Sequence, residues 1–319
     1  MDLFIGLDLG GTWLKYGLAG RDGKLLVRQK RPSEAQKGPE AIFGSMTAAV
    51  HELLDKAKQW GRVQAIGVGS PGLVDYRRGI LAGGAPNLPG WEGADIRGVL
   101  EGRFGLPTFA DNDANVMALA EARLGAAQGA RQAIFLTLGT GIGGGILIDG
   151  QLYRGAWFAG AELGHTVIKF DGRPCGCGNI GCVEQYASAP GMIRTYLERL
   201  EAAGKEQPAR ITTEEIFARA NQGEPEAKKA IEDTAYYLGV AMASFVNIFN
   251  PEVIVVGGGV AEAGDEFIQM AERVAKKLAQ ALATRGLRIV RAGLGNDAGT
   301  VGAILLAAES YDSQMARGS

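Results

Sequence analysis

LFIGLDLGGT, residues 3–12, and AIFLTLGTG, residues 133–141, share one pattern: an apolar run that ends in a glycine-threonine turn. Each run has the length of a buried strand. A second apolar run returns after each turn and ends in an Asp-Gly pair, Asp22-Gly23 or Asp149-Gly150, which is typical of a hairpin. The chain therefore uses one strand-turn-strand unit twice, which indicates an internal duplication of an α/β unit.

The rest of the sequence supplies the strands and helices that complete two such units. We expect further strands at residues 63–68, 107–110, 252–256 and 287–292. We expect helices at residues 39–60, 114–126, 213–221, 226–249, 265–283 and 298–309, with Thr212 as an N-cap and a frayed end at 313–319. Residues 1–112 with 298–319 should form a small α/β domain and residues 113–297 a larger one, facing each other across a cleft.

Composition excludes several classes of protein. The chain has 319 residues, 46% hydrophobic and 21% charged, which is typical of a globular protein. Its 33 basic and 35 acidic residues give a net charge of −2, so nucleic acid and anionic membranes are not expected partners. We find no apolar run long enough to span a membrane and no signal peptide, and expect a cytoplasmic protein.

The stretch from Gly139 to Gly145 satisfies the G-x-G-x-x-G pattern of dinucleotide-binding loops. That loop must open a helix, whereas here the glycines lead into a strand, so the dinucleotide interpretation fails. A glycine-rich hairpin can still bind phosphate, because its backbone N–H groups can converge on an anion, and Thr140 adds a hydroxyl. The alternative is a tight turn without a ligand. Asp8, before the first turn, is suited to a hydrated Mg²⁺.

Asn112-Asp113-Ala114-Asn115 lies where a strand ends and a helix begins. An aspartate in this place is most often an N-cap and nothing more. Asp111 and Asn115, however, add more polar groups than capping requires. Phosphoryl transfer to a hydroxyl needs one carboxylate base on a rigid element, so Asp113 is the candidate base.

All three cysteines fall in Cys175-Gly176-Cys177-Gly178-Asn179-Ile180-Gly181-Cys182, close after Glu162-Leu163-Gly164-His165. Three thiols and one imidazole form a typical closed tetrahedral zinc site, so the ion would be structural. The alternative is three reduced thiols and one core histidine. Glu184 follows at once, so zinc at His165, Cys175, Cys177 and Cys182 would fix the loop from which Glu184 projects.

With these motifs, nearly the whole chain resembles the ROK family of sugar kinases and repressors, most of all its bacterial ATP-dependent glucokinases. The glycine-rich stretch up to Gly164-His165 and the C-x-C-x₄-C loop carry the resemblance. It implies an actin-like (ribonuclease H-like) fold and a hexose, ATP, Mg²⁺ and structural Zn²⁺ as ligands. It implies that phosphates are bound by Asp8, Gly10, Gly11, Thr12, Thr140 and Gly141, and adenosine by Gly257, Gly258 and Gly259. It implies that Asp113 is the base for the sugar's 6-hydroxyl and that the sugar contacts Gly72, Asn87, Asn112, Asp113, Glu162, His165 and Glu184.

The resemblance leaves alternatives open. Trp13 stands where many relatives carry Lys or Asn, and Lys15 is the candidate for the same phosphate contact. Asn87-Leu88-Pro89-Gly90-Trp91 favours glucose over an N-acetylhexosamine or mannose, and the three intact cysteines do not favour a fructokinase. A repressor would carry a DNA-binding segment before Asp8, for which we see no room. Polyphosphate is the alternative donor to ATP. We expect a homodimer or a dimer of dimers.

Overall fold

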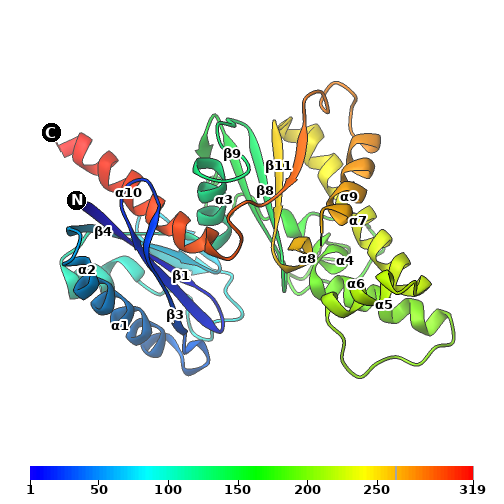
Figure 1. Cartoon of the computed structure of the whole chain (residues 1–319), viewed down its shortest axis with the longest axis horizontal. Helices are drawn as coiled ribbons and strands as arrows, with labels where there is room; N and C mark the ends of the chain where they lie inside the picture. Colours follow the sequence, from blue (N-terminus) through cyan, green and yellow to red (C-terminus); the bar gives the residue numbers. More distant parts are fainter. Residues whose placement is uncertain (263, 319) are drawn as a thin grey trace. The chain divides into compact units, whose positions relative to one another are not determined.

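The computed structural model describes residues 1–262 and 264–318, which form two compact units (Figure 1). Unit 1 contains Met1–Gln128, Leu152–Gly160 and the C-terminal segment from Asn296. Unit 2 contains Gly129–Gln151 and Ala161–Gly295. The chain thus passes between the units more than once, as a duplicated and interlaced fold requires.

Unit 1 is built on a five-stranded sheet in the order β3-β2-β1-β4-β7. The strands are β1 Asp2–Leu9, β2 Trp13–Ala19, β3 Leu25–Pro32, β4 Arg62–Ser70 and β7 Thr108–Asn112. β1 pairs antiparallel with β2 and parallel with β4. β1 is buried on both faces after its first residue, which explains its unbroken apolar run.

Helices cover both faces of this sheet (Figure 1). They are α1 Pro39–Ala57 on one face, and α3 Asp113–Arg123 and α10 Ala298–Gly318 on the other. α10 lies very close to the strands: a Cβ on Gly67 would come within 1.8 Å of the Ala303 carbonyl oxygen. Shorter elements complete the unit: η1 Ala35–Lys37, β5 Leu73–Asp75, β6 Ile80–Gly83 and α2 Ile96–Phe104.

Unit 2 repeats the plan with a sheet in the order β10-β9-β8-β11-β12. Its strands are β8 Ala133–Leu138, β9 Ile142–Ile148, β10 Gln151–Leu152, β11 Val253–Gly257 and β12 Arg288–Arg291. Its helical elements are η2 Leu163–His165, α4 Glu184–Ala187, α5 Ala189–Ala202, α6 Thr213–Asn221, α7 Pro225–Phe249, α8 Gly259–Glu262 and α9 Asp265–Leu278; η3 Gly295–Asp297 precedes α10. β8 pairs antiparallel with β9 and parallel with β11, as β1 does with β2 and β4. The duplication predicted from the two hairpins is therefore confirmed.

Other sequence predictions match with small shifts at element ends. Thr212 caps α6 through a capping box with Glu215. The predicted frayed end differs from the structure, since α10 continues through residue 318, while Ser319 lies outside the described residues. The compact units also divide after Gln128 rather than at residue 112, because α3 packs on α10.

Among the described residues, the helices include none that is both long and apolar enough to cross a membrane.

Candidate active site

The first glycine-threonine turn connects β1 to β2 in unit 1. The Gly10 N–H donates to the Trp13 carbonyl at 2.9 Å, and this closes the turn. Gly11 and Thr12 are exposed at its tip. The Trp13 ring is 44% exposed, and the Lys30 ammonium lies over it, 4.6 Å from its centroid. The Lys15 ammonium lies 4.0 Å from an Asp8 carboxylate oxygen, so Lys15 supplies the positive charge beside this turn.

Asp8 is a buried carboxylate at the end of β1. Burial raises its pKa to about 6; nearby Asp113 adds to this shift and Lys15 opposes it. The carboxylate also lies against the first turn of α10, where a Cβ on Gly299 would come within 2.3 Å of it. A buried carboxylate with a raised pKa is typical of functional sites, since the fold alone gains little from it.

Asn112, not Asp113, is the N-cap of α3. Its side-chain oxygen accepts from the N–H groups of Ala114 at 2.9 Å and Asn115 at 3.2 Å. Asp113 occupies the first helical position, and one carboxylate oxygen also accepts from the Ala114 N–H. Burial raises the Asp113 pKa, while that hydrogen bond lowers it. The Asn112 side chain therefore already caps α3, and the Asp113 carboxylate is not needed as the N-cap.

The predicted sugar residues of unit 1 lie in contact with these motifs. The Asn112 amide donates to the Gly72 carbonyl at 3.0 Å, which joins the strand β7 to the turn after β4. Asn87 is exposed and lies beside the first glycine-threonine turn, because a Cβ on Gly11 would come within 3.8 Å of the Asn87 Cβ. The loop of Asn87 is fixed by buried Trp91, whose indole N–H donates to the Ser70 hydroxyl at 3.0 Å.

In unit 2, the second turn and the triple glycine lie side by side. The Gly139 N–H donates to the Gly141 carbonyl at 2.9 Å, and Thr140 is exposed at the tip. Gly258 has a φ of +87°, and a Cβ there would come within 2.4 Å of the Leu138 carbonyl oxygen. Gly257 is buried at the end of β11, and Gly258 and Gly259 are exposed. The predicted phosphate and adenosine segments of this unit are thus neighbours.

Glu184 begins the short helix α4 and faces the same turn. Its carboxylate accepts from the Ile142 N–H at 2.9 Å, and a Cβ on Gly141 would come within 2.5 Å of it. The other carboxylate oxygen lies 3.9 Å from the Cys175 sulfur. Glu184 therefore joins the glycine turn to the cysteine loop.

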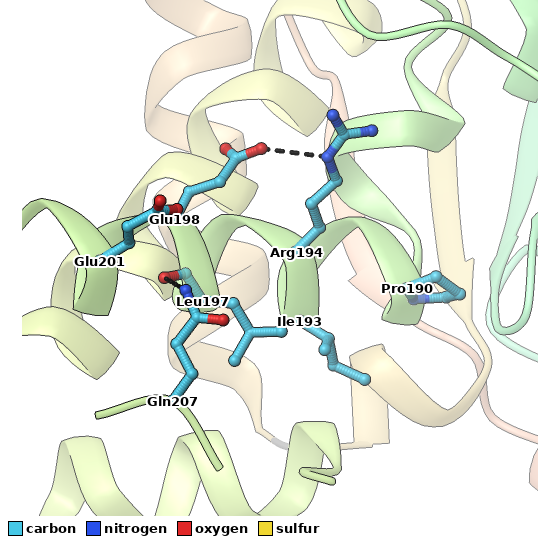
Figure 2. A pocket seen from close by; sticks show the side chains of 7 residues that line it. All are labelled: Pro190, Ile193, Arg194, Leu197, Glu198, Glu201 and Gln207. Atoms are coloured by element: carbon cyan, nitrogen blue, oxygen red, sulfur yellow. Dashed lines mark hydrogen bonds and ion pairs between the residues drawn. The ribbon is translucent and has the colours of Figure 1, made fainter. Parts of the chain in front are cut away.

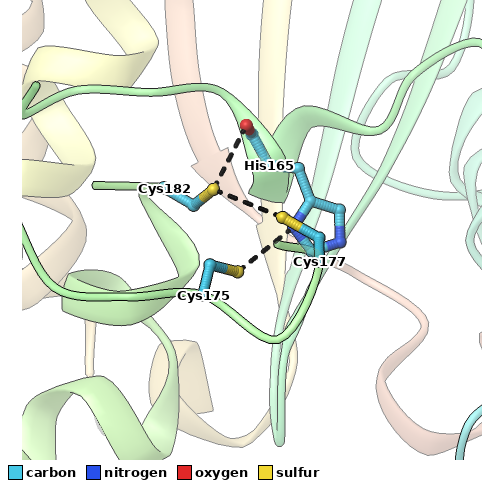
Figure 3. Close-up of side chains that lie close together, drawn as sticks. All are labelled: His165, Cys175, Cys177 and Cys182. Carbon is cyan, nitrogen blue, oxygen red and sulfur yellow. Dashed lines mark hydrogen bonds between the residues drawn. The ribbon is translucent and has the colours of Figure 1, made fainter. Parts of the chain in front are cut away.

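The four predicted metal ligands form one cluster (Figure 3). Their ligand atoms all lie within 4.8 Å of one another. His165 Nδ1 is 3.6 Å from the Cys175 sulfur, and the Cys177 and Cys182 sulfurs are 3.7 Å apart. Zinc–sulfur bonds of about 2.3 Å in a tetrahedron place the ligand atoms about 3.8 Å apart, so this donor set fits zinc.

The His165 ring has two different neighbours. Nδ1 faces the thiols, and Nε2 lies 3.9 Å from a carboxylate oxygen of the exposed Glu162. The ring can therefore bind a metal through one nitrogen and a polar ligand through the other.

A surface pocket of about 420 Å³ lies elsewhere in unit 2 (Figure 2). It is lined by α5 residues between Pro190 and Glu201 and by Gln207. None of the predicted site residues lines it.

The sequence missed two arginines beside the site. Arg154 binds the buried Asp111 carboxylate, with 2.7 Å from Nε to Oδ2. Arg173, two residues before Cys175, makes several contacts with α4 and α5. No local sequence motif predicts either residue, because each arginine forms these hydrogen bonds with residues that are not its neighbours in the chain.

Comparison with known proteins identifies the class. Residues 4–310 match the profile of the ROK family. A curated glucokinase from Halalkalibacterium halodurans is 35% identical over 94% of this chain and 93% of its own. A xylose repressor from Caldicellulosiruptor bescii is 31% identical, over 85% of this chain and 69% of its own. A solved ROK family glucokinase from Streptomyces griseus, in complex with glucose and AMPPNP, has a TM-score of 0.82, with 33% identity over 96% of this chain and 99% of its own.

The fold with its repeated sheets is thus that of the actin-like sugar kinases. The chain belongs to the ROK family.

Proposed function

We propose that this protein is an ATP-dependent kinase that phosphorylates the 6-hydroxyl of a hexose, glucose in the first place. The observation that carries the proposal is the position of the Asp113 carboxylate, which lies where β7 ends and α3 begins. The N-cap of α3 is Asn112, so Asp113 is not needed for that role. The similarity to glucokinases over nearly their whole length, and to a structure with bound glucose and an ATP analogue, supports the substrates.

Asp113 is proposed as the general base. Burial raises its pKa, which makes the carboxylate a stronger proton acceptor than an ordinary aspartate. Its neighbour Asn112 is fixed by three hydrogen bonds of its side chain, so the junction is rigid. A rigid base matters because phosphoryl transfer is catalysed largely by positioning and electrostatics.

Phosphates are proposed to bind at the two glycine-threonine turns. Bound Mg-ATP supplies the phosphoryl group and the metal neutralises its charge. In unit 1 the proposed groups are the Asp8 carboxylate and the Lys15 ammonium. In unit 2 they are the Thr140 hydroxyl and the backbone N–H of Gly141. Gly257–Gly259 is proposed to lie against the adenosine.

Zinc is proposed as a structural ion at His165, Cys175, Cys177 and Cys182, which leave no open position for chemistry. The proposed sugar contacts of unit 2 are Glu162, His165 and Glu184. Those of unit 1 are Gly72, Asn87 and Asn112. Coordination through Nδ1 would fix the His165 ring and leave Nε2 for the sugar.

The test is sugar-phosphate formation by purified protein with a panel of hexoses and N-acetylhexosamines, with ATP and then polyphosphate as the donor. ATP-dependent turnover with glucose at the highest kcat/KM supports the proposal. Turnover preferring N-acetylmannosamine or mannose would correct the sugar, and dependence on polyphosphate would correct the donor. Sugar binding without turnover, under conditions that saturate both substrates, would favour a sugar-sensing repressor, the second function that relatives of this chain have.

A further inference from the structure

The loop that carries the cysteines, residues 166–183, has its apolar anchors at its two ends, where Ile168 packs against the core and Val183 is buried in it. Phe170 is 90% exposed and Ile180 is 52% exposed. Backbone hydrogen bonds hold its two arms together, among them Gly181 N–H to the Arg173 carbonyl at 2.8 Å. A segment with so few buried side chains depends on specific polar contacts or on a metal for its order.

Arg173 supplies such contacts. Its side chain is only 10% exposed. Nη1 donates to the carbonyl oxygens of Gln185 at 2.7 Å and Gly191 at 3.2 Å. Nη2 donates to the Thr195 hydroxyl at 3.0 Å and the Glu198 carboxylate at 2.5 Å. The guanidinium also lies over the Tyr186 ring, 4.8 Å from its centroid.

These partners belong to α4 and α5, outside the loop. Gln185 and Tyr186 directly follow Glu184 in α4, and the Arg173 backbone N–H donates to the Tyr186 hydroxyl at 2.7 Å. One residue thus connects the arm that enters the cysteine cluster with the helix turn that carries Glu184. The planar, five-donor fork of arginine suits this arrangement, which a lysine ammonium cannot reproduce.

We propose that Arg173 is a positioning residue that orders the cysteine loop and Glu184 before metal and sugar bind. It touches neither the four zinc ligand atoms nor the proposed sugar contacts directly, so it acts through Gln185 and Tyr186. This role rests on the proposed function, because it concerns how the proposed sugar contact Glu184 of unit 2 is held in place.

The experiment compares Arg173→Met with Arg194→Met. Arg194 pairs with the same Glu198 at 3.0 Å but lies half-exposed on the pocket face of α5 (Figure 2) and is a matched control. Zinc affinity is measured by competition with a chelator, and KM for glucose and ATP by steady-state kinetics. We expect Arg173→Met to lower zinc affinity about 10- to 100-fold, as loss of groups that orient metal ligands does. Glucose KM should rise, ATP KM should change less than twofold, and Arg194→Met should match the parent.

Arg173→Lys keeps the positive charge opposite Glu198 and replaces Arg173→Met in the experiment if Arg173→Met does not fold. We expect the zinc affinity of Arg173→Lys to lie between those of Arg173→Met and the parent. Zinc affinity and glucose KM within twofold of the parent in the folded Arg173 variant would overturn the inference, and so would an equal loss in Arg194→Met. Parent protein without zinc affinity would overturn it as well. The zinc measurement needs no turnover, so a failed kinase assay would remove the proposed function without deciding the role of Arg173.

Discussion

The Asp111 carboxylate and the Arg154 guanidinium form a buried ion pair, with 2.6 Å between Oδ2 and Nη2. Asp111 is 1% exposed, and its other oxygen accepts from the Asn112 N–H at 2.8 Å and the Asn115 amide at 2.9 Å. Arg154 also lies over the Tyr76 ring, 4.3 Å from its centroid. The pair therefore fixes the end of β7 at the residue before Asn112-Asp113.

Removing Arg154 should destabilise unit 1, because it leaves the Asp111 charge buried and unpaired. We expect Arg154→Met to lower the free energy of unfolding by about 3–5 kcal/mol. The double variant Arg154→Met with Asp111→Asn should recover a good part of that loss, since no buried charge remains. Urea unfolding of the three proteins measures both values. A single variant as stable as the parent would show that the pair contributes nothing.

Asp113→Asn should remove activity and keep stability. The amide keeps the shape and an acceptor for the Ala114 N–H but cannot take the sugar proton, so kcat should fall about 10²- to 10⁴-fold. Asn112→Ala is the matched control for the helix cap and should lower the unfolding free energy by about 1 kcal/mol. Similar kcat in Asp113→Asn and the parent would reduce Asp113 to a structural residue.

Asp8 should make the protein less stable as the pH rises. Its folded pKa of about 6 lies above the ordinary aspartate value of 3.8, so between these values the folded state binds more protons than the unfolded state. The unfolding free energy therefore falls through this window, by up to about 3 kcal/mol for a shift of this size. Asp8→Asn should be more stable than the parent at pH 7.5 and lose this advantage near pH 4. Parallel pH profiles of urea unfolding for the two proteins would contradict this.

The sequence predicts best where periodicity or local capping chemistry decides the structure. The duplicated hairpins and the Thr212 cap depend on neighbours in the chain, and both are confirmed. Helix α5 was missed although its local signals are present: Ser188 caps it by accepting from the Gly191 N–H, and Pro190 lies in its first turn.

The candidate site was predictable only where its residues follow one another along the chain. Cys175 to Cys182 and Asn112-Asp113 are such motifs. That Asn112 rather than Asp113 caps α3 depends on side-chain geometry, which the spacing does not fix. Arg154 is 43 residues from Asp111, so their pairing depends on the tertiary fold.

Cys177→Ala tests whether the proposed zinc sets sugar affinity. Cys177 is exposed and contributes little to the core, so the variant should fold. It leaves three of the four donors, and we expect most of the zinc to be lost. The freed loop would then have to be ordered by the sugar on binding, which raises the glucose KM. The ATP KM should change less, because the turn from Gly139 to Gly141 is closed by its own backbone hydrogen bond and meets the loop through Glu184.

Asn179→Ala is the control for this variant, since Asn179 lies in the same loop and contributes a backbone carbonyl, not a side chain, to the hydrogen bond from the Cys175 N–H at 2.8 Å. Zinc content by elemental analysis comes first, and parent protein should hold about one equivalent. If the parent holds zinc, and Cys177→Ala loses it with an unchanged glucose KM, the metal does not organise the proposed sugar contacts His165 and Glu184. If Asn179→Ala raises the glucose KM equally while keeping its zinc, loop disturbance and not metal loss is the cause. Only a rise in glucose KM that follows zinc content across the three proteins agrees with a structural ion that positions the sugar site.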